Sequence, residues 1–407
     1  MTRRAAFVAV GSELLRAERP ETNSWTAARI LRSAGYVFTE KRVVEDCEDA
    51  VAQAVRDLLP RVDVVILSGG LGPTADDVTR EGVARALFRG LERHRPTGET
   101  IAARYAARGR PMPEFAWRMA DVVQGGELLP NPVGTAPGQW VEAAGCTLVL
   151  LPGVPSELAA MLIGSVAPRL GRGSGILTRA LRLAGVYESL VEQRVMHLYD
   201  RFGRENVTIL AGRGQVTLLL MAEGIDAAAR MAEMDEAFAT VVGQDLYGRD
   251  DDSLPSVVLA RVRQRGLRLA VAESCTGGMV ASQLVSVPGA SDVFLGGVVA
   301  YADDLKQALL GVTAELLAAH GAVSQEVANA MARGVDRLGA PCGLGITGVA
   351  GPSGGTAEKP VGTVYMTAMT PGGLAHRQHL FPGDRQMVRE LTAAFALDLL
   401  RRQLADA

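Results

Sequence analysis

Short runs of aliphatic and β-branched residues alternate along most of the chain with stretches whose apolar residues recur at helical spacing. Such runs are typical of buried strands. Strand–helix–strand alternation predicts a mainly parallel sheet covered on both faces by helices, an α/β fold. In the first part of the chain the predicted strands are 5–10, 37–44, 62–68 and 147–151, and the predicted helices are 24–34, 49–59 and one that starts at Ser156.

Two segments interrupt this pattern. Residues 171–175 form a linker of glycine, arginine and serine, and residues 248–255 are polar, charged and closed by Pro255. A chain of 407 residues exceeds one ordinary core, so several domains are expected. The predicted domains are an α/β domain at 1–170, a small α+β domain at 175–247, and a second α/β domain at 253–407 with strands at 267–272 and 294–301 and a final helix from residue 384.

Composition and charge narrow the class of protein. Hydrophobic residues make up 48% of the chain and charged residues 21%, which is typical of globular domains. The formal net charge of −3 gives no basic field for nucleic acid. No apolar run reaches the ~18 residues of a membrane span, and the four cysteines contain no C-x-x-C pair. We therefore expect a cytoplasmic protein with reduced thiols, no membrane span and no strong nucleic-acid signal.

The first chemical motif, residues 272–278 (AESCTGG), lies at a predicted strand-to-helix turn. A hydroxyl at such a turn meets free backbone N–H groups and the positive end of a helix, which favour an alkoxide and can supply an oxyanion hole. Ser274 is therefore a candidate nucleophile, although a Ser–Thr–Gly cluster also serves as an ordinary helix N-cap. Cys275 is a rival nucleophile, but it has no basic neighbour in the sequence.

A candidate general base follows at the end of the next predicted strand. Only three of the 42 basic residues are lysines, and one of them, Lys306, lies in the segment 301–306. A lysine can act as a base when burial lowers its pKa, whereas an arginine stays charged. The five histidines offer no recognisable Ser–His–Asp arrangement, so Lys306 is the preferred base, with a solvated helix lysine as the alternative.

A long glycine-rich loop, residues 346–363, follows a predicted buried strand. Glycines let the backbone approach a ligand closely, and successive N–H groups can form an anion-binding nest. The loop therefore predicts a site for a phosphate-bearing substrate, with a flexible hairpin as the alternative. Arg385, at the start of the final helix, can pair with that phosphate or be a surface arginine. The candidate binding residues here are Cys275, Thr276, Gly277, Thr347, Gly348, Gly351, Gly354, Gly355, Thr356, Lys359 and Arg385.

A second glycine-rich loop, residues 68–79 (SGGLGPTADDVT), follows the predicted strand 62–68. Ligands bind at the carboxyl ends of strands in open α/β sheets. Asp76 and Asp77 can hold a divalent cation, Mg²⁺ or a transition metal, and the alternative for Asp77 is a helix N-cap. Loops at 11–15 and 131–138 are expected at the same sheet edge. The candidate nucleotide-binding residues are Gly11, Ser12, Glu13, Asn23, Ser68, Gly69, Gly70, Gly72, Thr74, Asn131, Gly134, Pro152 and Gly153.

The motifs AESCTGG, VAYADDLKQALLGV and GITGVAGPSGGTAEKPVGTV resemble the nicotinamide-mononucleotide deamidase domain of the competence/damage-inducible protein A (CinA) family, with matching spacing over residues 255–405. The resemblance implies hydrolysis of the nicotinamide amide of nicotinamide mononucleotide to nicotinic acid mononucleotide and ammonia, without a cofactor. It also implies Ser274 as the nucleophile, Lys306 as its base and Tyr301 as an orienting hydroxyl.

The resemblance also bears on the oxyanion and on one departure from the family. Backbone N–H groups at 275–276 or at 347–348 would stabilise the tetrahedral oxyanion. The family often has Ser-Asn after the tyrosine, where this chain has Ala302 and Asp303. The family's role for that pair is therefore not carried over to this chain.

Residues 5–170 resemble the N-terminal domain of the same family, which is similar to molybdopterin-binding proteins, through GSELL, SGGLGPTADDVT, NPVGTAPG and LPGVPSE. This implies a three-layer α/β domain and metal-dependent cleavage of ADP-ribose to AMP and ribose 5-phosphate, with pterin binding as the alternative. The middle region resembles the family's KH-type module, without a G-x-x-G clamp for RNA. The resulting hypothesis is a bifunctional hydrolase of pyridine-nucleotide recycling and a homodimer. A non-catalytic interaction protein in DNA uptake is the rival.

Overall fold

The computed structural model describes residues 3–32, 34–171 and 176–406. It forms two compact units, a first unit of Met1–Leu177 with Ala222–Ala228 and a second unit of Thr178–Met221 with Ala229–Ala407. Residues 172–175 of the predicted first linker lie outside the described residues. The first unit contains the N-terminal domain, and the second contains most of the middle domain and all of the C-terminal domain.

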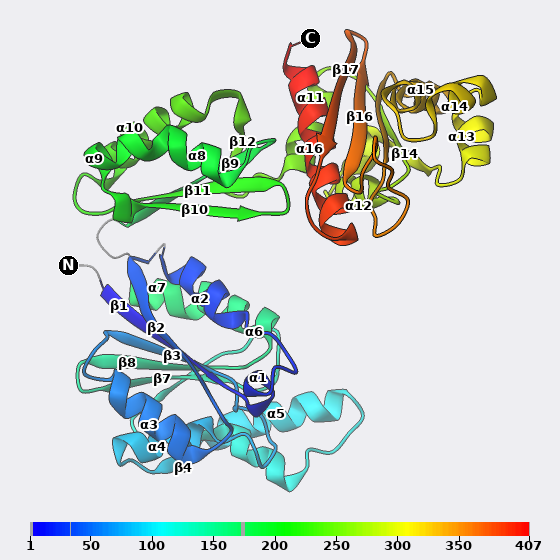
Figure 1. Ribbon diagram of the computed structural model, residues 1–407. Helices are drawn as coiled ribbons and strands as arrows, with labels where there is room; N and C mark the ends of the chain where they lie inside the picture. The colour runs from blue at the N-terminus through cyan, green and yellow to red at the C-terminus, as the bar shows by residue number, and fades with distance from the viewer. Residues whose placement is uncertain (1–2, 33, 172–175, 407) are drawn as a thin grey trace. The chain divides into compact units, whose positions relative to one another are not determined.

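The first unit is built on a six-stranded, mostly parallel sheet. Its strands are β1 (Arg3–Val10), β2 (Tyr36–Val44), β3 (Val64–Ser68), β6 (Glu127–Leu129), β7 (Gly138–Ala143) and β8 (Cys146–Leu151), and the short β4 (Leu91–Arg93) and β5 (Asp121–Val123) form a separate pair. The strand order is β2-β1-β3-β8-β7-β6, in which β2, β1, β3 and β8 run parallel and β7 and β6 are antiparallel additions (Figure 1). The carboxyl ends of β1 and β3 therefore lie side by side.

Helices cover both faces of this sheet and complete three layers. They are α1 (Ser12–Leu15), α2 (Asn23–Arg32), α3 (Glu48–Leu58), α4 (Thr79–Leu87), α5 (Arg95–Ala107), α6 (Pro155–Met161) and α7 (Ala167–Leu170), with a 3₁₀ segment η1 at Glu114–Ala120 and a π-helical turn at Leu162–Val166. Leu31 of α2 and Leu158 of α6 pack into one buried cluster, and Val55 of α3 and Val83 of α4 pack into the cluster on the opposite face. Figure 1 shows α2 and α6 on one side of the sheet and α3 and α4 on the other. The predicted three-layer α/β domain is confirmed.

The middle domain is a four-stranded antiparallel sheet with helices on one face. Its elements are β9 (Leu177–Ala184), α8 (Glu188–Val195), α9 (Tyr199–Phe202), β10 (Val207–Gly212), β11 (Gln215–Ala222), α10 (Ala227–Val242) and β12 (Leu246–Arg249), in the strand order β10-β11-β9-β12 (Figure 1). Buried and part-exposed residues alternate along β11, as one-sided coverage requires. The rings of Phe202 and Phe238 meet at 5.9 Å between α9 and α10.

The C-terminal domain has a five-stranded sheet of order β14-β13-β15-β16-β17. Its strands are β13 (Leu269–Glu273), β14 (Phe294–Val299), β15 (Cys342–Gly348), β16 (Thr363–Thr370) and β17 (Gly373–Leu380), and its helices are α11 (Leu254–Gln264), α12 (Met279–Val285), α13 (Asp303–Leu310), α14 (Ala314–His320), α15 (Gln325–Gly334) and α16 (Arg385–Asp406). The first three strands are parallel, and β16 and β17 are antiparallel.

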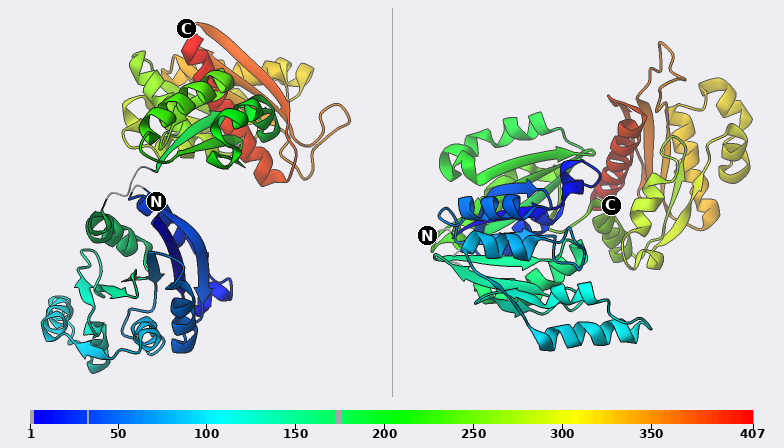
Figure 2. Two further views of the ribbon diagram at one scale, coloured as in Figure 1. Left: turned by 90° about the vertical axis from the view of Figure 1, so that its left-hand side faces the viewer. Right: turned by 90° about the horizontal axis from the view of Figure 1, so that it is seen from below.

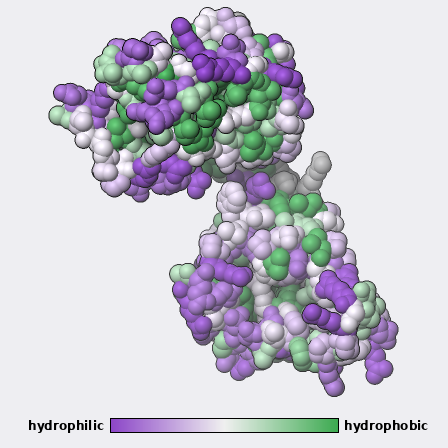
Figure 3. All heavy atoms as spheres, turned by 90° about the vertical axis from the view of Figure 1, so that its right-hand side faces the viewer, coloured by the Kyte–Doolittle hydropathy of each residue, from purple (hydrophilic) through white to green (hydrophobic). Residues whose placement is uncertain are grey.

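Two helical layers enclose this second sheet. Val258 of α11, Val280 of α12 and Leu397 of α16 share one core, and Leu310 of α13 and Met331 of α15 belong to the core on the other face. Figure 2 shows α16, in red, lying along the sheet beside β16 and β17. Within the described residues no helix is long and apolar enough to cross a membrane. Figure 3 shows hydrophilic side chains spread over the visible face of each unit.

Candidate active sites at two sheet edges

The three C-terminal motifs meet at one edge of the five-stranded sheet. Ser274 follows β13, Tyr301 follows β14, and the glycine-rich loop follows β15, so each motif stands at the carboxyl end of one of three adjacent parallel strands. The Ser274 N–H donates to the Ile346 carbonyl at 3.0 Å, and the Ala300 N–H donates to the Glu273 carbonyl at 2.8 Å. These backbone bonds hold the ends of the strands together.

The serine turn is shaped by a buried carboxylate. Glu273 is fully buried, and its carboxylate accepts the N–H groups of Gly278 at 3.0 Å, Val280 at 3.2 Å and Ala281 at 2.8 Å. It therefore caps α12 from the inside and occupies the first amides of that helix. The amides at 275–276 take no part in this cap, and they are the candidate oxyanion donors near Ser274. Sequence reasoning missed Glu273, although an acidic residue ending the apolar strand LAVAE is a visible signal.

Cys275 and Thr276 are both buried beside Ser274. Burial raises the pKa of the Cys275 thiol to about 12, so at neutral pH the thiol stays protonated and is a weak nucleophile. The Thr276 side chain is fully buried, and its hydroxyl has no hydrogen-bond partner in the part of the chain that the structure describes. Ser274 is also buried, at 7% exposure, so Ser274 is preferred over Cys275 because the thiol stays protonated and not because of its exposure.

Lys306 is 2% exposed and lies in the first turns of α13. Its Nζ donates to the Tyr301 carbonyl at 3.2 Å and to Asp303 Oδ1 at 3.0 Å. Among the described residues no hydrogen bond joins it to Ser274. Asp303 therefore holds the amine beside the end of β14.

Two arginines of α16 tie the motifs together. Arg385 donates to the Gly351 carbonyl at 2.7 Å and to the Tyr301 hydroxyl at 3.0 Å. Arg389 donates to the Thr276 carbonyl at 2.9 Å and 3.3 Å. The predicted site residue Arg385 thus joins the tyrosine to the glycine-rich loop, and Arg389 anchors the serine turn.

In the glycine-rich loop, side chains hold the backbone in place. The buried Thr347 hydroxyl donates to the Ala322 carbonyl at 2.7 Å, and Lys359 Nζ donates to the His320 carbonyl, at the end of α14, at 2.9 Å. The Lys359 N–H donates to the Thr356 hydroxyl at 3.0 Å. The φ angles are +82° at Gly351 and +89° at Gly354, and a Cβ atom at Gly348 or Gly355 would lie 2.8 Å from backbone atoms. At Gly277, φ is +61°.

A cavity of about 600 Å³ opens at the sheet edge of the first unit. Most of the predicted N-terminal residues line it, among them the glycines of the loops after β1 and β3 and both metal candidates. Residues that the sequence did not single out also line it, including Tyr105 and Met119 of the α5–η1 region and the carboxylates of Asp46 and Glu157. The predicted residues at the cavity wall are Gly11, Glu13, Gly69, Gly70, Gly72, Asp76, Asp77, Pro152 and Gly153.

The loop after β3 has two positions that only glycine fits, and hydrogen bonds from Arg80 hold its backbone in place. Gly69 has a φ of +106°, and a Cβ atom there would lie 2.2 Å from the Val10 carbonyl oxygen. At Gly70 a Cβ atom would lie 2.3 Å from the Thr79 hydroxyl oxygen. Arg80 is fully buried and donates to the carbonyls of Leu71 at 2.8 Å and Gly72 at 2.9 Å, and burial lowers its pKa.

The two aspartates of this loop differ in their surroundings. Asp77 accepts the Thr74 N–H at 2.8 Å and also the Thr74 hydroxyl. Asp76 is exposed, and the Thr74 side chain lowers its pKa, so it is ionised at neutral pH. The described residues contain no group of three or more His, Cys, Asp or Glu side chains that could hold a metal ion. A cation here would therefore share its coordination with oxygens of a bound ligand, as Mg²⁺ does at phosphate sites.

Other predicted residues form hydrogen bonds that hold the loops around the cavity in place. Asn23 donates to Ser68 Oγ at 3.0 Å and to the Gly153 carbonyl at 2.8 Å, while its buried Oδ1 has no partner among the described atoms. Asn131 accepts the Gly134 N–H at 2.7 Å and donates to Glu157 at 2.7 Å. The Ser12 N–H and hydroxyl exchange hydrogen bonds with Asp46 at 2.8 Å and 3.1 Å.

Three stretches of the chain match known domain families. Residues 6–172 match the "Probable molybdopterin binding domain". Residues 178–248 match the "Damage-inducible protein CinA KH domain", and residues 251–404 match the "CinA C-terminal domain". These three matched ranges agree with the three domains of the structure.

Whole proteins are similar over the same extent. A CinA-like protein of Frankia casuarinae is 42% identical over 418 residues, which cover 99% of this chain and 96% of the relative. A CinA-like protein of Acidobacterium capsulatum is 40% identical over 411 residues, covering 98% and 99%. A solved structure of a competence-damaged protein (CinA) superfamily protein from Escherichia coli is 36% identical, covers 37% of this chain and 88% of that chain, and has a TM-score of 0.36. On the full-length relatives, the chain belongs to the CinA family.

Proposed function

We propose that the C-terminal domain hydrolyses the amide of nicotinamide mononucleotide with Ser274 as nucleophile and Lys306 as base. The observation that carries this proposal is that a buried serine and a buried lysine follow two neighbouring parallel strands, β13 and β14, at the sheet edge where the glycine-rich loop also begins. A lysine in such surroundings can take up and return a proton, which an arginine cannot do.

The reaction would proceed in two halves. Ser274 Oγ attacks the carboxamide carbon while Lys306 takes its proton, and the tetrahedral oxyanion is stabilised by amides of the turn at 275–276. The C–N bond then breaks, and the proton passes to the leaving nitrogen, which departs as ammonia. Water hydrolyses the serine ester, releases nicotinic acid mononucleotide and restores the hydroxyl.

The surrounding residues suit the rest of the substrate. The backbone amides of the glycine-rich loop can receive the 5′-phosphate. Arg385 brings a positive charge between this loop and the Tyr301 hydroxyl. Tyr301 is 60% exposed, so its ring is available to a ligand.

The test is ammonia release from nicotinamide mononucleotide by the purified protein and its variants. We expect Ser274→Ala and Lys306→Ala to lose at least ~10³-fold in kcat, because each removes a group of the covalent mechanism. Cys275→Ala should retain turnover, since its thiol is protonated at neutral pH. Lys41→Ala, which removes a lysine paired with Glu21 in the first unit, is the matched control and should behave like the wild type. An active Ser274→Ala protein would exclude the serine mechanism, and an inactive wild type would exclude the substrate.

As a second activity, we propose metal-dependent hydrolysis of ADP-ribose to AMP and ribose 5-phosphate in the N-terminal cavity. The supporting observation is that the carboxylates of Glu13, Asp46, Asp76, Asp77 and Glu157 line one cavity together with glycine-rich loops. A diphosphate among so many carboxylates is repelled unless a cation neutralises the charge. Asp76 and Asp77 would hold that divalent ion, which supplies charge neutralisation at the diphosphate.

AMP formation from ADP-ribose tests this second activity. We expect Asp76→Asn to reduce kcat by at least ~10²-fold and a chelator to abolish turnover of the wild type. Asp49→Asn is the control and should stay active, because it alters an exposed aspartate of α3 that pairs with Arg85 of α4. AMP formation that persists in chelator would refute metal dependence. Tight binding of a pterin with no AMP formation would favour the pterin-binding alternative.

A further inference from the structure

Helix α16 makes two sets of contacts that lie at different points along its length. Near its start, Arg385 and Arg389 hold Tyr301, Gly351 and Thr276 of the candidate site. About nine residues beyond Arg389, or roughly 13 Å at 1.5 Å per residue, a second cluster begins at Asp398. Because an α-helix is a stiff rod, a displacement at one cluster is carried to the other.

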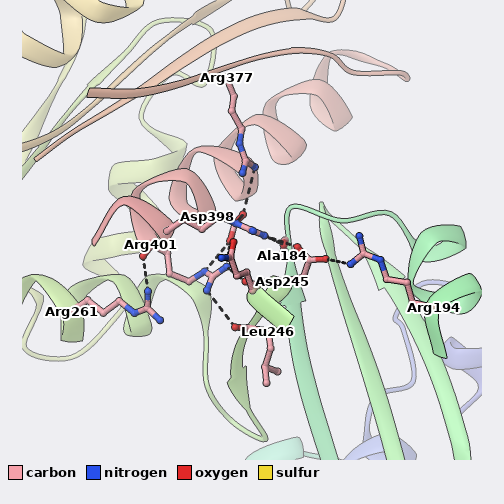
Figure 4. Close-up of polar contacts among 10 residues, drawn as sticks. Ala184, Arg194, Asp245, Leu246, Arg261, Arg377, Asp398 and Arg401 are labelled. Atoms are coloured by element: carbon pink, nitrogen blue, oxygen red, sulfur yellow. Dashed lines mark hydrogen bonds and ion pairs between the residues drawn. The ribbon is translucent and has the colours of Figure 1, made fainter. Parts of the chain in front are cut away.

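The second cluster is a buried ionic network (Figure 4). Asp398 is fully buried, and its carboxylate accepts Arg401 Nε at 2.9 Å and Nη2 at 2.6 Å, and Arg402 Nε at 2.7 Å. Arg377 of β17 approaches the same carboxylate at 3.8 Å, and Arg261 of α11 donates to the Arg401 carbonyl at 2.6 Å. Arg401 and Arg402 lie on the same helix as Asp398, so its carboxylate orients their two guanidinium groups, while Arg377 joins the carboxylate to β17.

The network continues into the middle domain. Arg402 donates to Asp245 at 2.7 Å and to the Ala184 carbonyl at 3.3 Å, and Arg194 of α8 also donates to Asp245, at 2.7 Å. Arg401 donates to the carbonyls of Gln244 at 2.7 Å and Leu246 at 3.3 Å. The end of α16 is therefore bonded to the segment that leads into β12 and to the end of β9.

Apolar packing also connects the middle domain to the C-terminal domain. Ala184 and Tyr247 of the middle domain belong to the buried cluster that forms the core of the C-terminal domain. At Gly185, which has a φ of +72°, a Cβ atom would lie 2.3 Å from Asp398 Oδ2. A side chain at this position would clash with the buried carboxylate, so the backbone of the middle domain at Gly185 packs directly against Asp398.

We infer that the middle domain is a positioning element of the C-terminal active site and acts through α16. Asp245, Arg402 and Asp398 are the positioning residues, and Arg385 and Arg389 deliver the effect to the glycine-rich loop and the serine turn. The kinetic part of this inference rests on the proposed deamidase function. The structural part does not, because it concerns only the stability of the site.

Amide hydrogen exchange of the full chain without substrate tests the structural part. In Asp245→Asn we expect exchange to speed up about tenfold in peptides that cover 274–281 and 349–355, because α16 loses part of its support. Asp235→Asn is the matched control, since Asp235 pairs with Arg249 inside the middle domain and forms no hydrogen bond or ion pair with α16 within the described residues. Unchanged exchange at the site in Asp245→Asn, or equal acceleration in both variants, would overturn the inference. If Asp245→Asn does not fold, Arg402→Gln serves the same comparison.

The kinetic part is tested by nicotinamide mononucleotide turnover. The arginines at the start of α16 hold the binding loop, the tyrosine and the serine turn, so in Asp245→Asn KM should rise about threefold to tenfold and kcat should fall by about twofold or more. Asp235→Asn should keep both constants. A wild type that releases no ammonia refutes the proposed function and leaves the exchange result to decide the inference. An active wild type with an unchanged KM in Asp245→Asn refutes the coupling alone.

Discussion

At the scale of single residues, burial acts differently on neighbouring groups of the C-terminal domain. Cys275 and Lys306 are both almost completely buried. Burial raises the pKa of the thiol to about 12, whereas the lysine amine keeps two oxygen partners close by. A thiolate is intrinsically a stronger nucleophile than a serine hydroxyl, but burial keeps Cys275 protonated, so Cys275 is the weaker candidate.

His379 gives a prediction of pH-dependent stability. Its ring lies 5.0 Å from that of Phe381 and 4.7 Å from that of Phe395, and burial together with the charge of Arg377 lowers its pKa below 6.5. Protonation therefore favours the unfolded chain, and the free energy of unfolding should fall as the pH drops below 6.5. His379→Phe removes this proton site, so its Tm should fall by about 2 °C less than that of the wild type between pH 7.5 and pH 5.5.

His376→Phe is the control for this measurement, because His376 is exposed on the same strand. It should keep the pH dependence of the wild type. The prediction fails if His379→Phe and the wild type lose the same Tm on acidification.

Side-chain roles at this scale were only partly predictable. The sequence identified Ser274, Lys306 and Asp76 from residue type and spacing. It could not show that the side chains of Asn131 and Thr347 form hydrogen bonds with backbone groups, because the partner groups come within reach only after folding. Arg80 and Glu273 were not singled out either, although the acidic residue that ends the apolar strand LAVAE was a visible signal.

At the scale of elements, the predicted strands and helices agree closely with the fold. The run at 62–68 became β3, and the helical spacing at 49–59 became α3. The antiparallel β7 was not predicted. Its sequence GQWVEA mixes polar and apolar residues, and its burial comes from its place between β8 and β6.

The N-terminus of α12 gives a prediction at this scale. In Glu273→Gln the amide NH₂ would face N–H donors that the carboxylate now satisfies, so a buried amide is left unpaired. We expect the free energy of unfolding to fall by about 1–3 kcal/mol and kcat for ammonia release to fall with it, as the serine turn loosens. Urea unfolding and single-substrate kinetics measure the two effects.

Glu326→Gln is the matched control for that prediction, since Glu326 lies in the first turn of α15 with a partly exposed side chain. It should alter neither quantity. Full stability and full turnover in Glu273→Gln would show that the cap is dispensable.

At the scale of the whole molecule, each unit has its own buried core. The ionic network of Asp398, Arg402 and Asp245 lies inside the second unit. Asp398→Ala leaves the buried guanidinium of Arg401 without its carboxylate, which should destabilise the second unit by about 3–5 kcal/mol. Calorimetry should therefore show one unfolding transition moving to lower temperature and another staying in place. Asp336→Ala, at an exposed position of the same unit, should move neither.

The order of the domains was predictable, but this ionic network was not. Glycine-rich and polar segments mark domain ends in any sequence. The network pairs Asp245 with Arg402, which are separated by 157 residues, and no local pattern connects them.

The cysteines make the N-terminal cavity accessible to chemical labelling. Burial raises the pKa of Cys146 and Cys275 to about 12 and that of Cys342 to about 11, so these thiols resist maleimide at neutral pH. Cys47 is only half-buried and directly follows Asp46, which lines the cavity. The chain thus offers one preferred attachment point for a fluorophore, and a dye there would lie next in sequence to a residue of the cavity wall, where its emission can be followed as a nucleotide is added.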